Sequence, residues 1–145
     1  MSNSSIEEEI REKGTLVYSN SGRSMLPLIR EGKDMVVLVR PTGPLKKYDV
    51  PLYKPTPFNG KYVLHRIIKV QNGQYVIRGD NCINAERGIT DKDIVGVLSS
   101  VIRSGKEVKT SAWGYRIYSR VWVFLFPVRL AFTKAKALLR RVIKR

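Results

Sequence analysis

Residues 61–78 have the sequence KYVLHRIIKVQNGQYVIR. Two runs rich in β-branched and aromatic residues flank the dipeptide Asn72-Gly73, and such a dipeptide favours the tight turn of a β-hairpin. The stretch therefore predicts two antiparallel strands, one from Lys61 to Val70 and one from Gln74 to Arg78, and it favours a β fold.

Short strands and turns continue on both sides of this hairpin. Asp34 to Arg40 and Tyr48 to Lys54 precede it, while Ile94 to Arg103 and Glu107 to Lys109 follow it around Ser104-Gly105. Because no long helical segment lies between these strands, the sequence predicts a small, mainly β domain of antiparallel hairpins.

The N-terminal segment from Met1 to Gly14 is polar and acidic, so we expect no signal peptide. Ser4 or Ser5 can cap a short helix that ends at Gly14. The sequence contains no apolar run of about 18–20 residues, and we therefore expect no membrane-spanning helix.

The charge of the chain is concentrated at one end. The 145 residues contain 27 Lys and Arg against 12 Asp and Glu, for a formal net charge of +15. Residues 113–145 contain no acid, and their cations are Arg116, Arg120, Arg129, Lys134, Lys136, Arg140, Arg141, Lys144 and Arg145. The composition changes near Ser111, which predicts a β domain at 1–112 and a basic amphipathic helical tail at 113–145.

Cysteine and histidine usage excludes several classes of protein. One Cys cannot form an internal disulfide, so nothing in the sequence requires an oxidising compartment. One His and one Cys are a poor ligand set for zinc, which usually takes three or four protein ligands. We expect neither a metal nor another cofactor.

The tail has the pattern of amphipathic helices. From Arg129 onward the apolar side chains fall on one arc at about 100° per residue and the cations on the other, while Pro127 separates this helix from a preceding one. Such a helix suits an anionic membrane surface. Two alternatives are packing against the β domain and, without a recognition motif to support it, binding of nucleic acid.

The only histidine of the chain lies within the predicted strand from Lys61 to Val70. Alternation along that strand places His65 between Val63 and Ile67 on a largely apolar face. One interpretation is therefore a buried imidazole that is hydrogen-bonded to a backbone carbonyl.

Three segments together favour a catalytic role for this imidazole. The heptad Ser-Gly-Arg-Ser-Met-Leu-Pro at 21–27 places a hydroxyl on a constrained turn, and the segment at 78–88 contains Arg-Gly-Asp-Asn-Cys and Ala-Glu-Arg-Gly. Nucleophilic catalysis needs a hydroxyl, a base of near-neutral pKa and an acid that orients the base. An ordinary Ser/Gly loop and a polar turn between strands are the structural alternatives.

The order Ser-Met-x-Pro, a strand with His-Arg-Ile, and then Gly-Asp-Asn resembles the signal peptidase I superfamily, which includes the LexA-like self-cleaving repressors. Bacterial signal peptidases and LexA-like proteins have a Lys base in the second segment. Because this position is His65 here, the chain resembles the Ser–His–Asp branch of endoplasmic-reticulum and archaeal signal peptidases. The resemblance extends from about Gly14 to Lys109.

The resemblance implies that Ser24 is the nucleophile and His65 the general base. The acid of that branch lies six positions after the Asp of Gly-Asp-Asn, which leads from Asp80 to Glu86, a Glu in place of the usual Asp. Asp80 is the other candidate acid, or a residue that orders the turn. We expect Cys82 to be a partly buried filler, and weaker candidates for the acid are Asp91 and Asp93.

The oxyanion hole departs from the pattern of the family. Many members have Ser two positions before the nucleophile, whereas this chain has Gly22 there and Ser21 one step earlier. The N–H of Ser24 must then stabilise more of the oxyanion. Loss of one oxyanion donor typically lowers the rate by about 10²–10³, so we expect a slow or narrowly specific enzyme.

These observations predict a serine endopeptidase that cleaves a peptide bond in a signal- or leader-type peptide or a small precursor protein. We expect it on the cytoplasmic side of the membrane, attached peripherally through residues 113–145, with a peptide substrate and no nucleic-acid partner. The sequence does not predict an oligomeric state. The alternative is a non-catalytic peptide- or membrane-binding module that keeps the peptidase fold.

Overall fold

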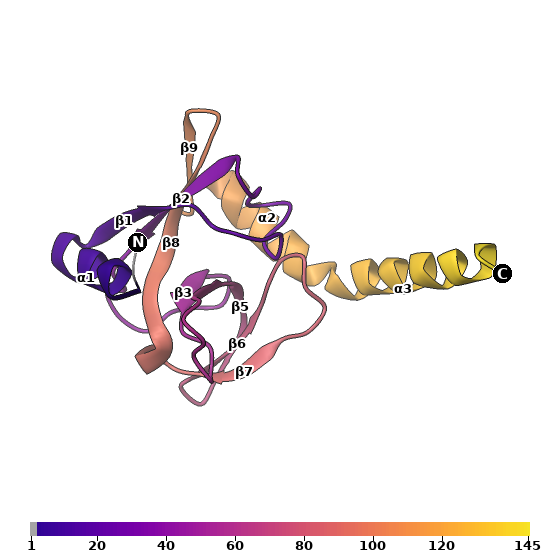
Figure 1. Ribbon diagram of the computed structural model, residues 1–145, viewed down its shortest axis with the longest axis horizontal. Helices are drawn as coiled ribbons and strands as arrows, with labels where there is room; N and C mark the ends of the chain where they lie inside the picture. The colour runs from indigo at the N-terminus through magenta and orange to yellow at the C-terminus, as the bar shows by residue number, and fades with distance from the viewer. Residues whose placement is uncertain (1–2) are drawn as a thin grey trace.

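A computed structural model of the chain describes residues 3–145 and shows a mainly β protein with antiparallel sheets, a short N-terminal helix and two C-terminal helices (Figure 1). The helices and strands are, in chain order, α1 (Asn3–Lys13), β1 (Thr15–Tyr18), β2 (Asp34–Val39), β3 (Pro51–Tyr53), β4 (Val63–Leu64), β5 (Arg66–Gln71), β6 (Gln74–Arg78), β7 (Glu86–Ile89), a 3-10 helix (Asp91–Asp93), β8 (Ile94–Arg103), β9 (Lys106–Lys109), α2 (Trp113–Phe124) and α3 (Phe126–Ile143). The predicted fold class is confirmed.

The strands form two sheets. The larger has the order β1-β2-β8-β3-β4, with β9 also paired to β8, and the smaller has the order β5-β6-β7. Every strand pair is antiparallel. The long strand β8 pairs with β2, β3 and β9, so it connects most of the larger sheet.

The two predicted hairpin turns are confirmed. Asn72 and Gly73 both have positive φ angles, 52° and 72°, and they connect β5 to β6. Ser104 and Gly105, with φ angles of 51° and 76°, connect β8 to β9 in the same way. Two consecutive positive φ angles are the signature of the type I′ turn, whose twist matches that of the flanking strands.

The prediction of a single strand from Lys61 to Val70 is wrong. This segment contains two strands, β4, which pairs with β3 in the larger sheet, and β5, which pairs with β6 in the smaller sheet. His65 lies at the break between them. The chain passes from one sheet to the other here, so simple alternation fails and the consecutive residues Arg66 and Ile67 are both buried.

Two groups of buried apolar side chains hold the domain together. The first joins α1, the larger sheet and α2 through residues such as Ile10, Leu38 and Tyr115. The second includes Tyr53 and Ile77 and joins β3 to the smaller sheet. β4 contributes Leu64 to the first group and β5 contributes Ile67 to the second, and the imidazole between them is therefore held by the packing of two sheets.

The C-terminal helices separate at Leu125, next to the predicted break at Pro127. α2 packs against the domain with Tyr115 and Ser119 buried, whereas every residue from Ala131 to Arg145 is exposed. Figure 1 shows α3, in yellow, extending away from the sheets. Among the described residues, no helix has both the length and the apolar character needed to cross a membrane.

Candidate functional site

A cleft of about 690 Å³ lies between the segment that follows β1 and the segment around β4. Ser24, His65 and Glu86 all line it. These three residues come from segments that are far apart in sequence, and the structure brings them to one cavity. Ser21, whose hydroxyl lies three positions before Ser24, also lines the cleft.

The loop that bears Ser24 is anchored at both ends. Near its start Gly22, which has a φ of 93°, donates its N–H to the Glu31 carboxylate at 2.8 Å. At its end, the buried carboxylate of Asp34 accepts from Arg30 and Arg103, and these bonds hold the pKa of Asp34 well below its usual range despite the opposing effect of burial. Ser24 is thus presented on a fixed loop.

The N–H of Ser24 has no hydrogen-bond acceptor among residues 3–145. The N–H of Gly22 is already engaged by Glu31. The N–H of Ser24 is therefore available to a developing oxyanion, which is the role the sequence predicts for it.

The imidazole of His65 lies at the inner side of the cleft, with 14% of the side chain exposed. Its Nδ1 is 3.5 Å from the Tyr53 hydroxyl and 3.9 Å from Glu86 Oε1. Burial lowers the pKa of His65, and the charges of Glu86 and Asp80 oppose that effect. A neutral imidazole near pH 7 can accept a proton from a hydroxyl.

The carbonyl-bonded histidine that the sequence left as an alternative does not occur. Within residues 3–145 no backbone carbonyl accepts a hydrogen bond from His65, and Nε2 is free of hydrogen bonds. Ser24 Oγ and His65 Nε2 are not hydrogen-bonded to each other in this structure. Such bonds are often long before substrate binds and shorten in the reacting complex.

The two candidate acids occupy different environments. Glu86 begins β7, has 42% of its side chain exposed and lies beside the imidazole. The carboxylate of Asp80 is buried in an ion pair with Arg66, at 2.8 Å to Nε and 2.9 Å to Nη2, and it accepts from the Tyr118 hydroxyl at 2.9 Å. Of the two, Glu86 is the carboxylate that lies next to Nδ1.

The weaker candidates Asp91 and Asp93 lie in the turn before β8. Asp91 accepts from the Tyr75 hydroxyl at 2.5 Å, and Asp93 accepts from the N–H of Thr90 at 2.9 Å. Neither lines the cleft. Their hydrogen bonds order the 3-10 helix that precedes β8.

Gly79 lies at the point where the segments that bear Ser24, His65 and Cys82 meet. A Cβ atom on Gly79 would lie 2.7 Å from the Ser24 carbonyl oxygen, 2.7 Å from Cys82 Sγ and 3.0 Å from His65 Cδ2. Cβ contacts below 3.0 Å essentially do not occur in proteins. The Ser24 carbonyl and the His65 ring can therefore both pack against residue 79 only because it has no side chain.

Cys82 is partly buried, and its Sγ lies 3.9 Å from the Ser24 carbonyl oxygen. Burial raises the pKa of its thiol, so the reactive thiolate is disfavoured. Its position beside Gly79 and its packing agree with a small filler rather than a nucleophile.

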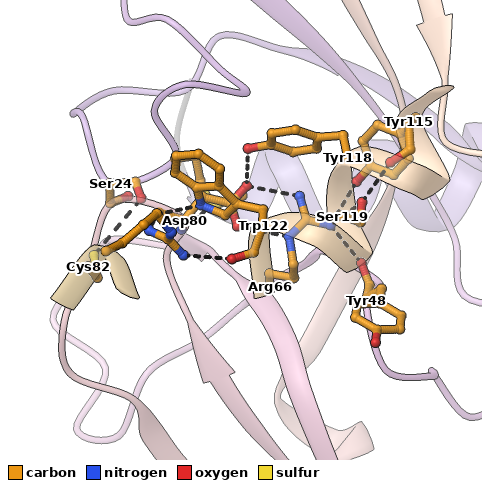
Figure 2. A network of polar contacts seen from close by, with 11 residues as sticks. Ser24, Tyr48, Arg66, Asp80, Cys82, Tyr115, Tyr118, Ser119 and Trp122 are labelled. Atoms are coloured by element: carbon orange, nitrogen blue, oxygen red, sulfur yellow. Dashed lines mark hydrogen bonds and ion pairs between the residues drawn. The ribbon is translucent and has the colours of Figure 1, made fainter. Parts of the chain in front are cut away.

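Arg66, for which the motifs predict no role, is fully buried next to His65. Beyond Asp80, its Nη1 donates to the Tyr48 carbonyl at 2.9 Å, to the Ser119 hydroxyl at 2.8 Å and to the Tyr115 hydroxyl at 3.2 Å. Figure 2 shows this network joining the domain to α2. The signal in the sequence is an arginine in the middle of an apolar strand. A charged residue that is buried there must have a partner, because charged residues are buried only when they are paired.

Tyr53 is a second residue that sequence analysis did not identify. It is fully buried, its hydroxyl lies beside His65 Nδ1, and burial followed by hydrogen bonding to Glu86 raises its pKa. The hydroxyl stays protonated and can donate to Glu86 while it accepts from Nδ1–H. In that arrangement Nε2 is left as the basic nitrogen of the imidazole.

Among residues 3–145 no group of three or more His, Cys, Asp or Glu side chains could hold a metal ion. Comparison of the chain with known protein families, with curated proteins and with solved structures finds no match.

Proposed function

We propose that the protein is a serine endopeptidase in which Ser24 is the nucleophile, His65 the general base and Glu86 the acid that orients the imidazole. The observation that supports this proposal most directly is the convergence of the three side chains on one cleft, with Glu86 on the Nδ1 side of His65. A hydroxyl, a neutral imidazole and a carboxylate are the groups that acyl transfer requires.

In the proposed reaction, His65 Nε2 removes the proton of Ser24 Oγ as the oxygen attacks the scissile carbonyl carbon. The N–H of Ser24 stabilises the resulting oxyanion. His65 then donates the proton to the leaving amine, and the C–N bond breaks to give an acyl-enzyme. Water, deprotonated by His65, attacks the ester and releases the second product with the Ser24 hydroxyl restored.

Glu86 and Tyr53 support the imidazole in this reaction. The carboxylate stabilises the imidazolium that forms when His65 accepts the proton, and the Tyr53 hydroxyl lies within reach of both groups. A Ser–His–Glu arrangement with a bridging hydroxyl tolerates the 3.9 Å between Nδ1 and Oε1. The Glu in place of the usual Asp is thus compatible with the proposed role.

The proposed substrate is a segment of peptide in extended conformation. In the part of the chain that the structure describes, β1 pairs with β2 and β4 pairs with β3, and each has an open edge. The cleft is lined by residues of β1 and β4. An extended peptide can add to such an edge through its backbone, and a signal- or leader-type peptide or small precursor protein fits this description.

Labelling with a fluorophosphonate tests the mechanism without a known substrate. An activated serine oxygen attacks the phosphorus of this probe and displaces fluoride. We expect wild type to be labelled at Ser24, Ser24→Ala not at all, and His65→Ala at least about 100-fold more slowly. The Cys82→Ala variant should be labelled like wild type. An unlabelled wild-type chain would contradict the proposal and favour a non-catalytic peptide-binding module.

Two acid variants test the assignment of Glu86. Glu86→Gln should slow labelling while it leaves thermal stability nearly unchanged, because this side chain is partly exposed. Asp80→Asn should mainly lower the thermal stability, because it weakens the buried ion pair with Arg66. Equal labelling rates for Glu86→Gln and wild type would remove Glu86 from the mechanism.

We further infer that the protein attaches to an anionic membrane surface through its C-terminal helices. Arg129, on the polar arc of α3, contacts the domain, whereas Val128 and Phe132, on the apolar arc, are each 64% exposed and face away from it. Each cation near an anionic surface contributes about 1 kcal/mol. Cosedimentation of the full chain with anionic vesicles, compared with neutral ones, tests this attachment.

A further inference from the structure

One peptide unit connects the proposed nucleophile to the C-terminal helices. On its nitrogen side, the N–H of Asn81 donates to the Ser24 carbonyl at 2.8 Å. The side-chain amide of Asn81 donates to the neighbouring carbonyl of Arg23 at 3.0 Å. Asn81 therefore fixes two consecutive carbonyl groups of the loop that bears Ser24.

The oxygen of the same peptide unit is the carbonyl of Asp80, and it points toward the helices. Trp122 Nε1, from α2, donates to it at 2.9 Å (Figure 2). Arg129 Nη1, from the first turn of α3, donates to it at 3.2 Å. One planar group is thus held by the helices at one end and holds the Ser24 loop at the other.

Arg129 is itself held in place by α2. Its guanidinium lies 3.9 Å from the centre of the Trp122 ring, and its Nη2 donates to the Trp122 carbonyl at 2.9 Å. Its Nε is buried and has no hydrogen-bond partner among the described residues. A buried guanidinium nitrogen without a partner is costly, so the contacts of the other two nitrogens are the ones that keep Arg129 here.

We propose that Trp122 and Arg129 are positioning residues for Ser24, acting through the Asp80–Asn81 peptide unit, an inference that rests on the proposed peptidase function. A trans peptide is planar and stiff, so a displacement of its oxygen also tilts its N–H. A cationic donor polarises the carbonyl and strengthens the hydrogen bond at the N–H. The helices are therefore part of the catalytic unit rather than a separable anchor.

Neither positioning residue lines the cleft, whose walls contain no residue of α2 or α3. Their loss should therefore change the rate of the step at Ser24 and leave the affinity for a ligand in the cleft nearly unchanged. Misplacement of a reacting atom by about 1 Å lowers rates by about 10²-fold. A partial displacement of the Ser24 loop should lower the rate by about tenfold.

The experiment uses the full chain and the fluorophosphonate probe, with kinact and KI determined separately from the concentration dependence of labelling. We expect Arg129→Ala to lower kinact about tenfold, with KI within about twofold of wild type. Arg129→Lys should recover part of the loss, because an ammonium can replace one donor. Trp122→Phe keeps the ring and removes the N–H, and it should lower kinact by a smaller factor.

Arg11→Ala is the matched control, since it removes an exposed arginine whose side chain bonds to neither Asp80 nor Ser24. Unchanged kinact in both Arg129→Ala and Trp122→Phe, with His65-dependent labelling of wild type, would overturn this inference and leave the proposed function intact. A reduced final extent of labelling at unchanged kinact would indicate a merely structural role and would also overturn it. An unlabelled wild type would overturn both proposals.

Discussion

α2 and α3 follow each other in the chain and have similar compositions, but they contact the rest of the protein differently. Both are amphipathic, contain arginines and lack acidic residues. α2 buries Tyr115 and Ser119 against the domain, whereas α3 has no buried residue. The spacing of apolar residues in the two helices does not indicate which of them packs against the domain.

The difference arises from what each helix meets on the domain. The inner face of α2 supplies two hydroxyl groups that accept from Nη1 of Arg66, a buried cation whose other acceptors are Asp80 and the Tyr48 carbonyl. α3 meets the domain near its start, where Arg129 bonds to Asp80 and the Arg78 guanidinium lies 3.3 Å from the centre of the Phe126 ring. A helix docks when it satisfies a buried polar group of its partner, and hydropathy alone does not reveal that requirement.

The largest expected effect comes from Arg66→Leu, which removes the hydrogen bonds from the domain to the hydroxyl groups of Tyr115 and Ser119 in α2. The carboxylate of Asp80 would then stay buried without its cation, and breaking a buried pair typically costs about 3–5 kcal/mol. Urea denaturation measures this loss. Arg141→Leu, on the exposed part of α3, should change the free energy of unfolding by less than about 0.5 kcal/mol. Similar losses in both variants would contradict the contrast between the helices.

A smaller effect is expected when the apolar face of α3 is broken. Leu139→Glu places a charge among exposed apolar side chains, and removal of one buried Leu from a lipid interface costs about 2 kcal/mol. Binding to anionic vesicles should weaken by at least about tenfold, with no loss of stability. Tyr118→Phe, on the inner face of α2, should bind vesicles like wild type. Equal binding by Leu139→Glu and wild type would exclude this face as the lipid contact.

Two hydroxyl groups provide a closely matched comparison. Ser119 donates to the Tyr115 carbonyl at 3.0 Å and Thr133 donates to the Arg129 carbonyl at 2.9 Å, each four residues earlier in its helix. Only Ser119 also accepts from Arg66. Ser119→Ala should therefore cost about 1.5 kcal/mol, and Thr133→Ala less than about 0.5 kcal/mol. Urea denaturation would contradict this assignment if the order were reversed.

The smallest effect concerns the pH dependence of fluorophosphonate labelling. The reactive imidazole is neutral, and burial lowers the pKa of His65 below its usual 6.5, so the rate should fall only below that pH. The Glu86 charge raises the pKa of His65, and Glu86→Gln should therefore move the acid limb to still lower pH. Arg141→Leu, on α3, should leave the limb unchanged. An acid limb above pH 6.5 in wild type would contradict a buried base.

Local patterns in the sequence predict much of the fold. The dipeptides Asn72-Gly73 and Ser104-Gly105 identify both type I′ turns, because few residue pairs accept two positive φ angles. The order of the motifs also singles out Ser24, His65 and Glu86, and these three residues line one cleft. The turns depend on neighbouring residues, and the grouping of the three site residues follows from the order of the motifs along the chain.

Features that depend on distant partners are not predicted. The break at His65 follows from a change of sheet that alternation cannot indicate. The burial of Arg66 depends on Asp80 and on Ser119, which lie 14 and 53 positions away. The role of Tyr53 depends on the fold bringing β3 beside Glu86. Each of these is a tertiary contact, and no local preference of the residues involved encodes it.

The two tryptophans of the chain lie in α2, in different environments. Trp113 is 78% exposed at the start of the helix, whereas Trp122 is partly buried between Arg129 and the Tyr118 ring. Each indole therefore reports on a different event through its own fluorescence. Transfer into lipid should shift the emission of Trp113 to shorter wavelength, and loosening of the helix junction should change the quenching of Trp122. With each indole replaced in turn by Phe, unlabelled protein can show optically which of the two events comes first.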